Sequence, residues 1–185
     1  PSNYNAVITV TATNTDTIGS PALVGVTVRV NPKARLAKDA LVITNVVTEG
    51  QDAPSKSFKV RNSSGYYTLE YSLSDNVDWM VLSPASGTST GEEDTVTVMF
   101  STVHLTAGVS NAVITITGRT FDGTHYDNAS DATQQVAVTV LVTPRATLAT
   151  DSRGEYGFSA RYGRPGGDGI FRVWNESSGG GGLEY

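Results

Sequence analysis

The sequence predicts an all-β protein, an immunoglobulin-like antiparallel β-sandwich in a tandem array. Three observations predict this fold class. Short segments alternate apolar and polar residues with a period of two, and many of the apolar residues are β-branched. Turn residues separate these segments about every 8–12 positions, and no helical periodicity interrupts them. Several segments also recur further along the chain at a spacing that suits a whole domain rather than a small solenoid unit.

Composition excludes several classes of protein. The 185 residues are 38% hydrophobic, include no cysteine and carry a formal net charge of −5. No run approaches the ~18 apolar residues of a membrane helix, and an acidic chain lacks the basic surface that nucleic acid requires. Without cysteine there are no disulfides and no cysteine-based zinc sites. The first residues include no methionine, basic region or apolar signal core, so we expect a mature or excised piece of a protein.

The first strands recur almost unchanged. Residues 5–11 (NAVITVT) match 111–117 (NAVITIT) at an offset of 106. Residues 24–32 (VGVTVRVNP) match 136–144 (VAVTVLVTP) at an offset of 112. The difference of six residues lies between the two strands, in a predicted loop where insertions are tolerated.

The end of the chain repeats its middle in the same way. Residues 171–178 (FRVWNESS) resemble 58–64 (FKVRNSS), and 183–185 repeat the LEY of 69–71. The sequence therefore predicts three units. Residues 1–35 are the C-terminal strands of a preceding repeat, 36–147 a complete repeat, and 148–185 the N-terminal strands of a following one. Two or three strands cannot close a sandwich alone, so we expect a window from a longer array, or missing strands supplied by neighbouring chains.

The complete repeat is organised around residues 78–100, in which a tryptophan, a short apolar run, a Ser-Pro-Ala-Ser-Gly turn and a second strand follow one another. Trp79 is the expected core residue of this segment. The strands are expected at 40–48, 56–63, 67–74, 79–82, 94–101, 110–118 and 133–143. The inward-facing set predicted from the alternation is Val60, Leu69, Tyr71, Leu73, Trp79, Leu82, Val96, Val98, Phe100, Ile114, Ile116, Val138 and Val140.

These motifs resemble a known family. In order, the repeat reads F-x-V-x-N, L-x-Y-S-L-S, D-W-x-x-L-S-P-x-S-G, T-V-T-V, L-T-A-G, A-x-I-T-I-T and V-x-V-x-V. This order is similar to the BACON type of bacterial immunoglobulin-like tandem repeat, with D-W-x-x-L-S-P-x-S-G as the most specific piece. The resemblance implies an extracellular sandwich, and the family name suggests carbohydrate binding. Val109 departs from the pattern, since many relatives have an aromatic residue after L-T-A-G, and this removes one surface aromatic.

No catalytic, cofactor or metal site is predicted. Residues 87–91 (GTSTG) match the G-x-S-x-G nucleophile elbow, but a strand follows them instead of the required helix, and His104 and His125 lie in predicted loops. Acidic residues gather at 92–94 and in the predicted loop at Asp122, Asp127 and Asp131. They lack the spacing of a calcium loop, and a solvated acidic loop explains them. The glycine-rich residues 163–169 lie between strands and indicate a turn rather than a phosphate-binding loop.

Exposed aromatics and sequons are the remaining candidate sites. Trp174 stands where the complete repeat has Arg61, and Tyr66 and Tyr67 lie in a predicted turn. Each could stack on a sugar or pack against a neighbour, and packing is favoured for Trp174. Three sequons begin at Asn62, Asn128 and Asn175, although asparagine at these positions can also simply end a strand.

The sequence therefore favours a non-enzymatic structural or interaction repeat of a large extracellular or cell-surface bacterial protein, acting as stalk, spacer or filament subunit. The alternatives are a carbohydrate-binding module and an adhesin repeat. Expected partners are neighbouring repeats or identical chains, with glycans as an alternative. Nucleic acid, a membrane span and cofactors are not expected.

Overall fold

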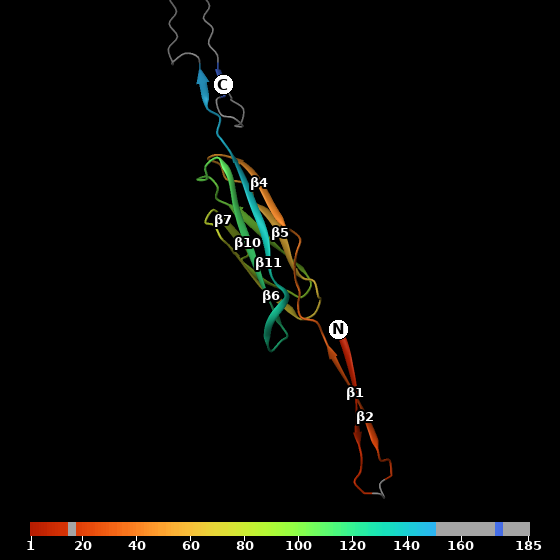
Figure 1. Ribbon diagram of the computed structural model, residues 1–185. Helices are drawn as coiled ribbons and strands as arrows, with labels where there is room; N and C mark the ends of the chain where they lie inside the picture. The colour runs from red at the N-terminus through yellow and green to blue at the C-terminus, as the bar shows by residue number, and fades with distance from the viewer. Residues whose placement is uncertain (15–17, 151–172, 176–185) are drawn as a thin grey trace, which may run out of the picture.

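The computed structural model describes residues 1–14, 18–150 and 173–175, and in these residues the regular structure is entirely strand, with no helix. A two-stranded hairpin of β1 (Ser2–Val10) and β2 (Ala22–Val30) comes first. A β-sandwich follows, and β12 (Leu148–Thr150) and β13 (Val173–Asn175) form a further short pair. In Figure 1 the hairpin extends from one end of the sandwich and β12 lies beyond the other. The described residues include no helix long and apolar enough to cross a membrane.

The sandwich has nine strands, arranged in two sheets. One sheet has the order β4-β11-β10-β6-β8, and the other has the order β3-β5-β9-β7. Every neighbouring pair is antiparallel except β4 and β11, which are parallel. The five strands of the first sheet are β4 (Val42–Thr48), β6 (Thr68–Asp75), β8 (Ser86–Ser89), β10 (Gly108–Phe121) and β11 (Tyr126–Thr143). The four strands of the second are β3 (Leu36–Lys38), β5 (Lys56–Asn62), β7 (Met80–Ser83) and β9 (Glu93–Phe100).

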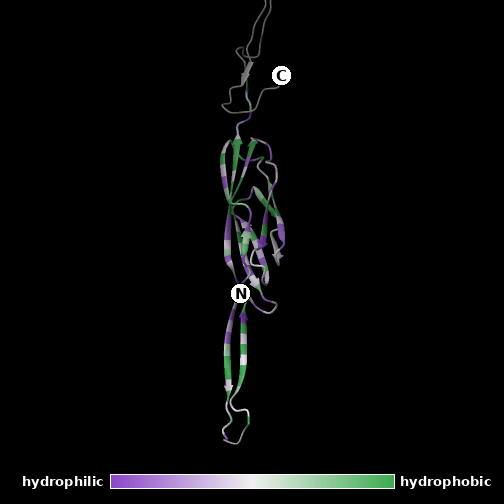
Figure 2. Ribbon diagram, turned by 90° about the vertical axis from the view of Figure 1, so that its right-hand side faces the viewer, coloured by the Kyte–Doolittle hydropathy of each residue, from purple (hydrophilic) through white to green (hydrophobic). Residues whose placement is uncertain are grey.

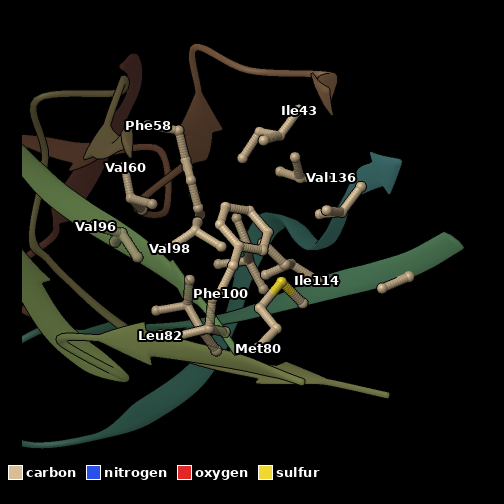
Figure 3. Close-up of a cluster of buried hydrophobic side chains, with 14 of the residues drawn as sticks. Ile43, Phe58, Val60, Met80, Leu82, Val96, Val98, Phe100, Ile114 and Val136 are labelled. Carbon is tan, nitrogen blue, oxygen red and sulfur yellow. The ribbon is translucent and has the colours of Figure 1, made fainter. Parts of the chain in front are cut away.

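The core lies between the two sheets because each strand turns alternate residues inward. In β9, for example, Val96, Val98 and Phe100 are buried while the residues between them are not. Phe58 of β5 is the largest of the almost fully buried side chains, and it points between the sheets (Figure 3). This interior needs neither disulfide nor metal, since a domain of this size buries about two-thirds of its unfolded surface.

The predicted all-β, immunoglobulin-like sandwich is confirmed, and the seven strands predicted within residues 36–147 are present with shifted ends. Two strands were not predicted, β3 and β8, because three or four residues are too short to show an alternation. The region 119–132, predicted as a loop, is instead an extension of the β10–β11 hairpin that ends at the Phe121–Tyr126 pair. A register shift between Thr117 and Arg119 marks where this extension begins.

The prediction that Trp79 is a central core residue is wrong. Its side chain is only partly buried, lies just before β7 and stacks on Phe100 with ring centroids 6.4 Å apart. Met80, the next residue, takes the inward position and is 4% exposed. The other predicted inward residues are all buried. Trp79 therefore closes the edge of the core, and Phe58 fills its middle.

Candidate functional site

The β1–β2 hairpin exposes its apolar side chains. Eight of its large hydrophobic residues have exposed fractions between 50% and 69%: Tyr4, Val7, Ile8, Val10, Leu23, Val24, Val28 and Val30. Figure 2 shows both strands coloured largely as hydrophobic, with no second sheet against them. A two-stranded sheet alone is marginally stable in water, so this surface indicates a missing partner.

The hairpin is paired in the same way as β10 and β11. Asn5 lies opposite Thr27 in β1–β2, and Asn111 lies opposite Thr139 in β10–β11. These are the positions that the sequence offsets of 106 and 112 match. The threonine hydroxyl donates to the asparagine side-chain oxygen in both pairs, at 2.9 Å in the hairpin and 3.0 Å in the sandwich. The repeated sequence thus forms a repeated local structure.

The short C-terminal pair repeats another part of the sandwich. Leu148 of β12 lies opposite Asn175 of β13, as Leu36 of β3 lies opposite Asn62 of β5. Trp174 lies opposite Ala149, at the position that Arg61 occupies in the sandwich. The backbone pairing therefore follows the recurring sequence segments on both sides of the sandwich.

The connector between the hairpin and the sandwich is held by the extended part of β11. The Lys33 ammonium lies 2.5 Å from a carboxylate oxygen of Asp127, and the Arg35 guanidinium lies 2.7 Å from Asp131. The backbone N–H of Ser130 also donates to the carbonyl of Ala34. The hydrogen bond from Lys33, followed by that from the Asn128 N–H, lowers the pKa of Asp127. Exposed ion pairs contribute little individually, but together with the backbone bond they fix the path of the chain into β3.

Asn62 organises the inner side of this junction. Its side chain is 2% exposed, and its amide nitrogen donates to the carbonyls of Tyr66 and Tyr67 at 3.1 and 3.0 Å. Its oxygen accepts from the backbone N–H groups of Arg35 and Ser64. The nitrogen that would carry a glycan is therefore occupied in the folded domain. The sequence offered a strand-ending asparagine as the alternative to a glycosylated one, but it did not predict this hydrogen-bond network.

The other two sequons lie on strands. Asn128 is exposed on β11, and Asn175 is the last residue of β13. Glycosylation at the three sequons stays a prediction.

Of the predicted aromatic sites, the side chain of Trp174 lies outside what the structure describes. Tyr66 is partly buried, whereas Tyr67 is 40% exposed in a left-handed backbone conformation with φ of 59°. Thr68, the next residue, pairs with Phe121 at the end of the β10–β11 extension.

A second aromatic group was missed because it lies in the predicted loop. The rings of Phe121 and Tyr126 stack with centroids 4.7 Å apart, and the Arg119 guanidinium lies 4.7 Å from the centre of the Tyr126 ring. Glu70 accepts from both the Arg119 guanidinium and the Tyr126 hydroxyl, and this second bond is the main reason that the pKa of Tyr126 is raised. Only the cross-strand geometry brings these residues together.

An open groove of about 650 Å³ lies beside this aromatic group. Residues of β6, β8, β10 and β11 line it, and most of them end in a hydroxyl, amide or charged group. Its polar lining residues include Glu70, Ser72, Thr88, Thr117, Arg119 and Asn128. The groove can present hydrogen-bond donors and acceptors to a polar ligand.

The serine of the GTSTG motif has a structural role. Ser89 is fully buried at the end of β8, donates its hydroxyl to the carbonyl of Glu92 and accepts from the N–H of Asn62. Asp122, one of the acidic residues predicted to lie in a loop, also has a structural role. It accepts hydrogen bonds from two backbone N–H groups of the turn, and these bonds lower its pKa. Within the described part of the chain, no group of three or more His, Asp or Glu side chains is placed to hold a metal ion.

Comparison with known protein families and with curated protein sequences finds no match. Solved structures do share the fold. A PapD-like domain of human CEP192 matches at 14% identity with a TM-score of 0.48, covering 63% of this chain and 91% of that domain. The periplasmic chaperone SfaE matches at 12% identity with a TM-score of 0.45, covering 58% of this chain and 56% of SfaE. A putative carbohydrate binding protein from Bacteroides ovatus matches at 14% identity with a TM-score of 0.48, covering 68% of this chain and 40% of that protein. The chain's own strand order and pairing make it an all-β immunoglobulin-like sandwich.

Proposed function

We propose that the chain is a structural repeat of an extracellular or cell-surface bacterial array, of the BACON type, in which successive sandwiches form a stalk, spacer or filament. One observation carries this proposal: the β1–β2 pair has the register and the Asn–Thr hydrogen bond of β10–β11. In the sandwich, β10 pairs with β6 and β11 with β4, and the facing sheet covers their inner side. The hairpin is therefore interpreted as the last strand pair of a preceding sandwich.

The ion pairs that hold residues 33–35 against β11 support a stiff spacer. Because the extension of β11 holds Lys33 and Arg35, the path between one unit and the next has fewer free torsions than a flexible linker would have. The acidic net charge keeps such an array soluble.

A fused chain tests the proposal. Placing a copy of residues 36–107 directly before Ser2 supplies the missing strands, because Gly108 of the complete repeat corresponds to Ser2. We expect the amides of β1 and β2 to exchange with deuterium at least about tenfold more slowly in the fused chain, as strands in a sandwich do.

The matched controls are two variants of the fused chain. Ile8→Asp, on the face that corresponds to the core side of β10, should abolish the added protection, whereas Thr9→Asp, on the opposite face, should leave it. Unchanged exchange in the fused chain would contradict the assignment of the hairpin to a preceding repeat.

Carbohydrate binding is the second candidate, and the groove beside Tyr126 is the observation that favours it. Hydroxyl, amide and carboxylate groups line the groove, and Tyr67, Phe121 and Tyr126 lie at the same end of the sheet. If the groove binds glycans, Tyr126→Ala should reduce binding on a glycan array at least about tenfold, the loss of about 1.4 kcal/mol. Tyr4→Ala, which removes another exposed tyrosine, from the hairpin, is the control. Absence of binding by the wild-type chain to any glycan would remove this candidate.

A further inference from the structure

The chain enters and leaves the sandwich beside the same strand. It enters through residues 33–36, which lie against the extended part of β11, and it leaves at Thr143, the last residue of β11. These two points lie at opposite ends of the sandwich, with the hairpin beyond one end and β12 beyond the other (Figure 1). A tension applied along the chain therefore reaches the sandwich at these two points.

Between the two points, residues 33–49 run parallel to residues 127–143. At the entry end, the carbonyl of Ala34 accepts from the Ser130 N–H at 2.8 Å, and the bridge that follows is parallel. β4 comes next, and each of its seven residues has a partner on β11 in the parallel register. The incoming chain is thus fastened to β11 near both ends of that strand.

The last bond of this ladder shows which groups of β4 carry it. The Glu49 N–H, just beyond β4, donates to the carbonyl of Thr143 at 2.8 Å. In a parallel ladder each strand turns alternate N–H groups toward its partner. The N–H of Val47 therefore points toward β11, whereas the N–H of Val46 points to the free edge of the sheet, since β4 is an edge strand.

Tension acts on the β4–β11 pair in shear. It pulls residues 33–49 toward the hairpin and β11 toward β12, so the two parallel segments are pulled past one another. The hydrogen bonds between them lie across the direction of the load and share it, and they must break together. The hairpin has the opposite arrangement: Ser2 lies opposite Val30, so tension at these two residues opens the antiparallel pairs one at a time.

We propose that the parallel β4–β11 pair is a mechanical clamp that keeps the sandwich folded when the chain is under tension. The load passes from the connector into residues 33–49, crosses the ladder into β11 and leaves at Thr143. The core between the sheets is not on this path. The biological role of the clamp rests on the proposed array, because neighbouring repeats would supply the tension, whereas the clamp itself is measurable on the single chain.

The recurring sequence places such clamps in series. Residues 24–32 match residues 136–144, so β2 leads into the first connector as β11 leads into the second. If β2 is the exit strand of a preceding unit, the load passes from one unit to the next through a connector of a few residues. The ion pairs of Lys33 and Arg35 with the extension of β11 then fasten the chain where the load arrives.

The direction of loading tests the inference on one variant, the full chain with Gln51→Cys. Residue 51 is exposed and follows β4, and the chain has no cysteine of its own, so the new thiol is a unique attachment point. In optical tweezers the variant is held at constant force, either by its two ends or by the thiol and the C-terminal end. The second geometry applies the load beside Thr143 and opens the ladder from one end. We expect the sandwich to survive at least about tenfold longer when it is held by its two ends, because several hydrogen bonds then resist together.

Proline substitutions in β4 supply a second measurement. Under load at the two ends, Val47→Pro should shorten the lifetime at least about tenfold relative to Val46→Pro, because only the first removes an N–H that faces β11. Val47 is also buried, so Val47→Ala measures the loss of its side chain and should shorten the lifetime less than Val47→Pro does.

Equal lifetimes in the two loading directions would overturn the inference. So would a Val46→Pro variant that is as short-lived as Val47→Pro. If Val47→Pro does not fold, the comparison of directions decides alone, since it uses one variant throughout. The fused chain reports on exchange in the hairpin and the force measurement on the central sandwich, so the two proposals can fail separately.

Discussion

Asn62→Asp is expected to destabilise the central sandwich by about 3 kcal/mol or more at pH 7, because it leaves a buried charge facing two carbonyl oxygens. The amide nitrogen of Asn62 donates to the carbonyls of Tyr66 and Tyr67, and a carboxylate oxygen in its place cannot donate. The site is 2% exposed, so water cannot replace these bonds. The β5–β6 turn and the start of β3 should loosen together, since Asn62 also accepts from Arg35.

The loss should depend on pH. Burial and the facing carbonyls would raise the pKa of the new carboxyl in the folded state above its unfolded value of about 3.9. The destabilisation is then full above the folded pKa and decreases as the pH falls through it, because the protonated carboxyl can donate to one carbonyl.

Urea unfolding at pH 7 and pH 4 measures the effect. Asn128→Asp is the control, since it makes the same change in an exposed sequon and should alter the free energy of unfolding by no more than about 0.5 kcal/mol. Equal losses in the two variants would contradict the structural role of Asn62.

Alternation and repetition made much of the fold predictable. A period of two is a direct consequence of strand geometry, so Val96, Val98 and Phe100 could be assigned to the core from the sequence. The match of residues 24–32 to 136–144 likewise anticipated the paired strands of the hairpin. Such signals can be read from short stretches of sequence, without knowing which distant residues contact one another.

The features that were missed depend on contacts between distant segments. Nothing near Asn62 in the sequence shows that the hydroxyl of Ser89 will accept a hydrogen bond from the Asn62 N–H. The acidic residues Asp127 and Asp131 read as a solvated loop, because their partners Lys33 and Arg35 lie almost a hundred positions earlier. The aromatic group at Tyr126 was hidden for the same reason. The junction and the groove are therefore products of the sheet register, which sequence patterns do not specify.

The second large effect is expected on the free energy of unfolding, because Phe58 is fully buried whereas Trp79 is only partly buried. Phe58→Ala should lower the free energy of unfolding by about 3–5 kcal/mol, because it removes a fully buried ring and leaves a cavity between the sheets. Trp79→Ala should cost less, about 1–2 kcal/mol, because part of its ring remains in water in the native state.

Chemical denaturation of both variants under the same conditions shows which loses more free energy of unfolding. The slope of that free energy against denaturant concentration checks that each variant still unfolds in one step. Phe58→Leu is the conservative control and should lose less than Phe58→Ala, since the branched side chain refills part of the space. A larger loss for Trp79→Ala than for Phe58→Ala would return the tryptophan to the centre of the core. The structure argues against that order, because Met80 rather than Trp79 takes the inward position at the start of β7, and Trp79 contacts the core from its edge through Phe100.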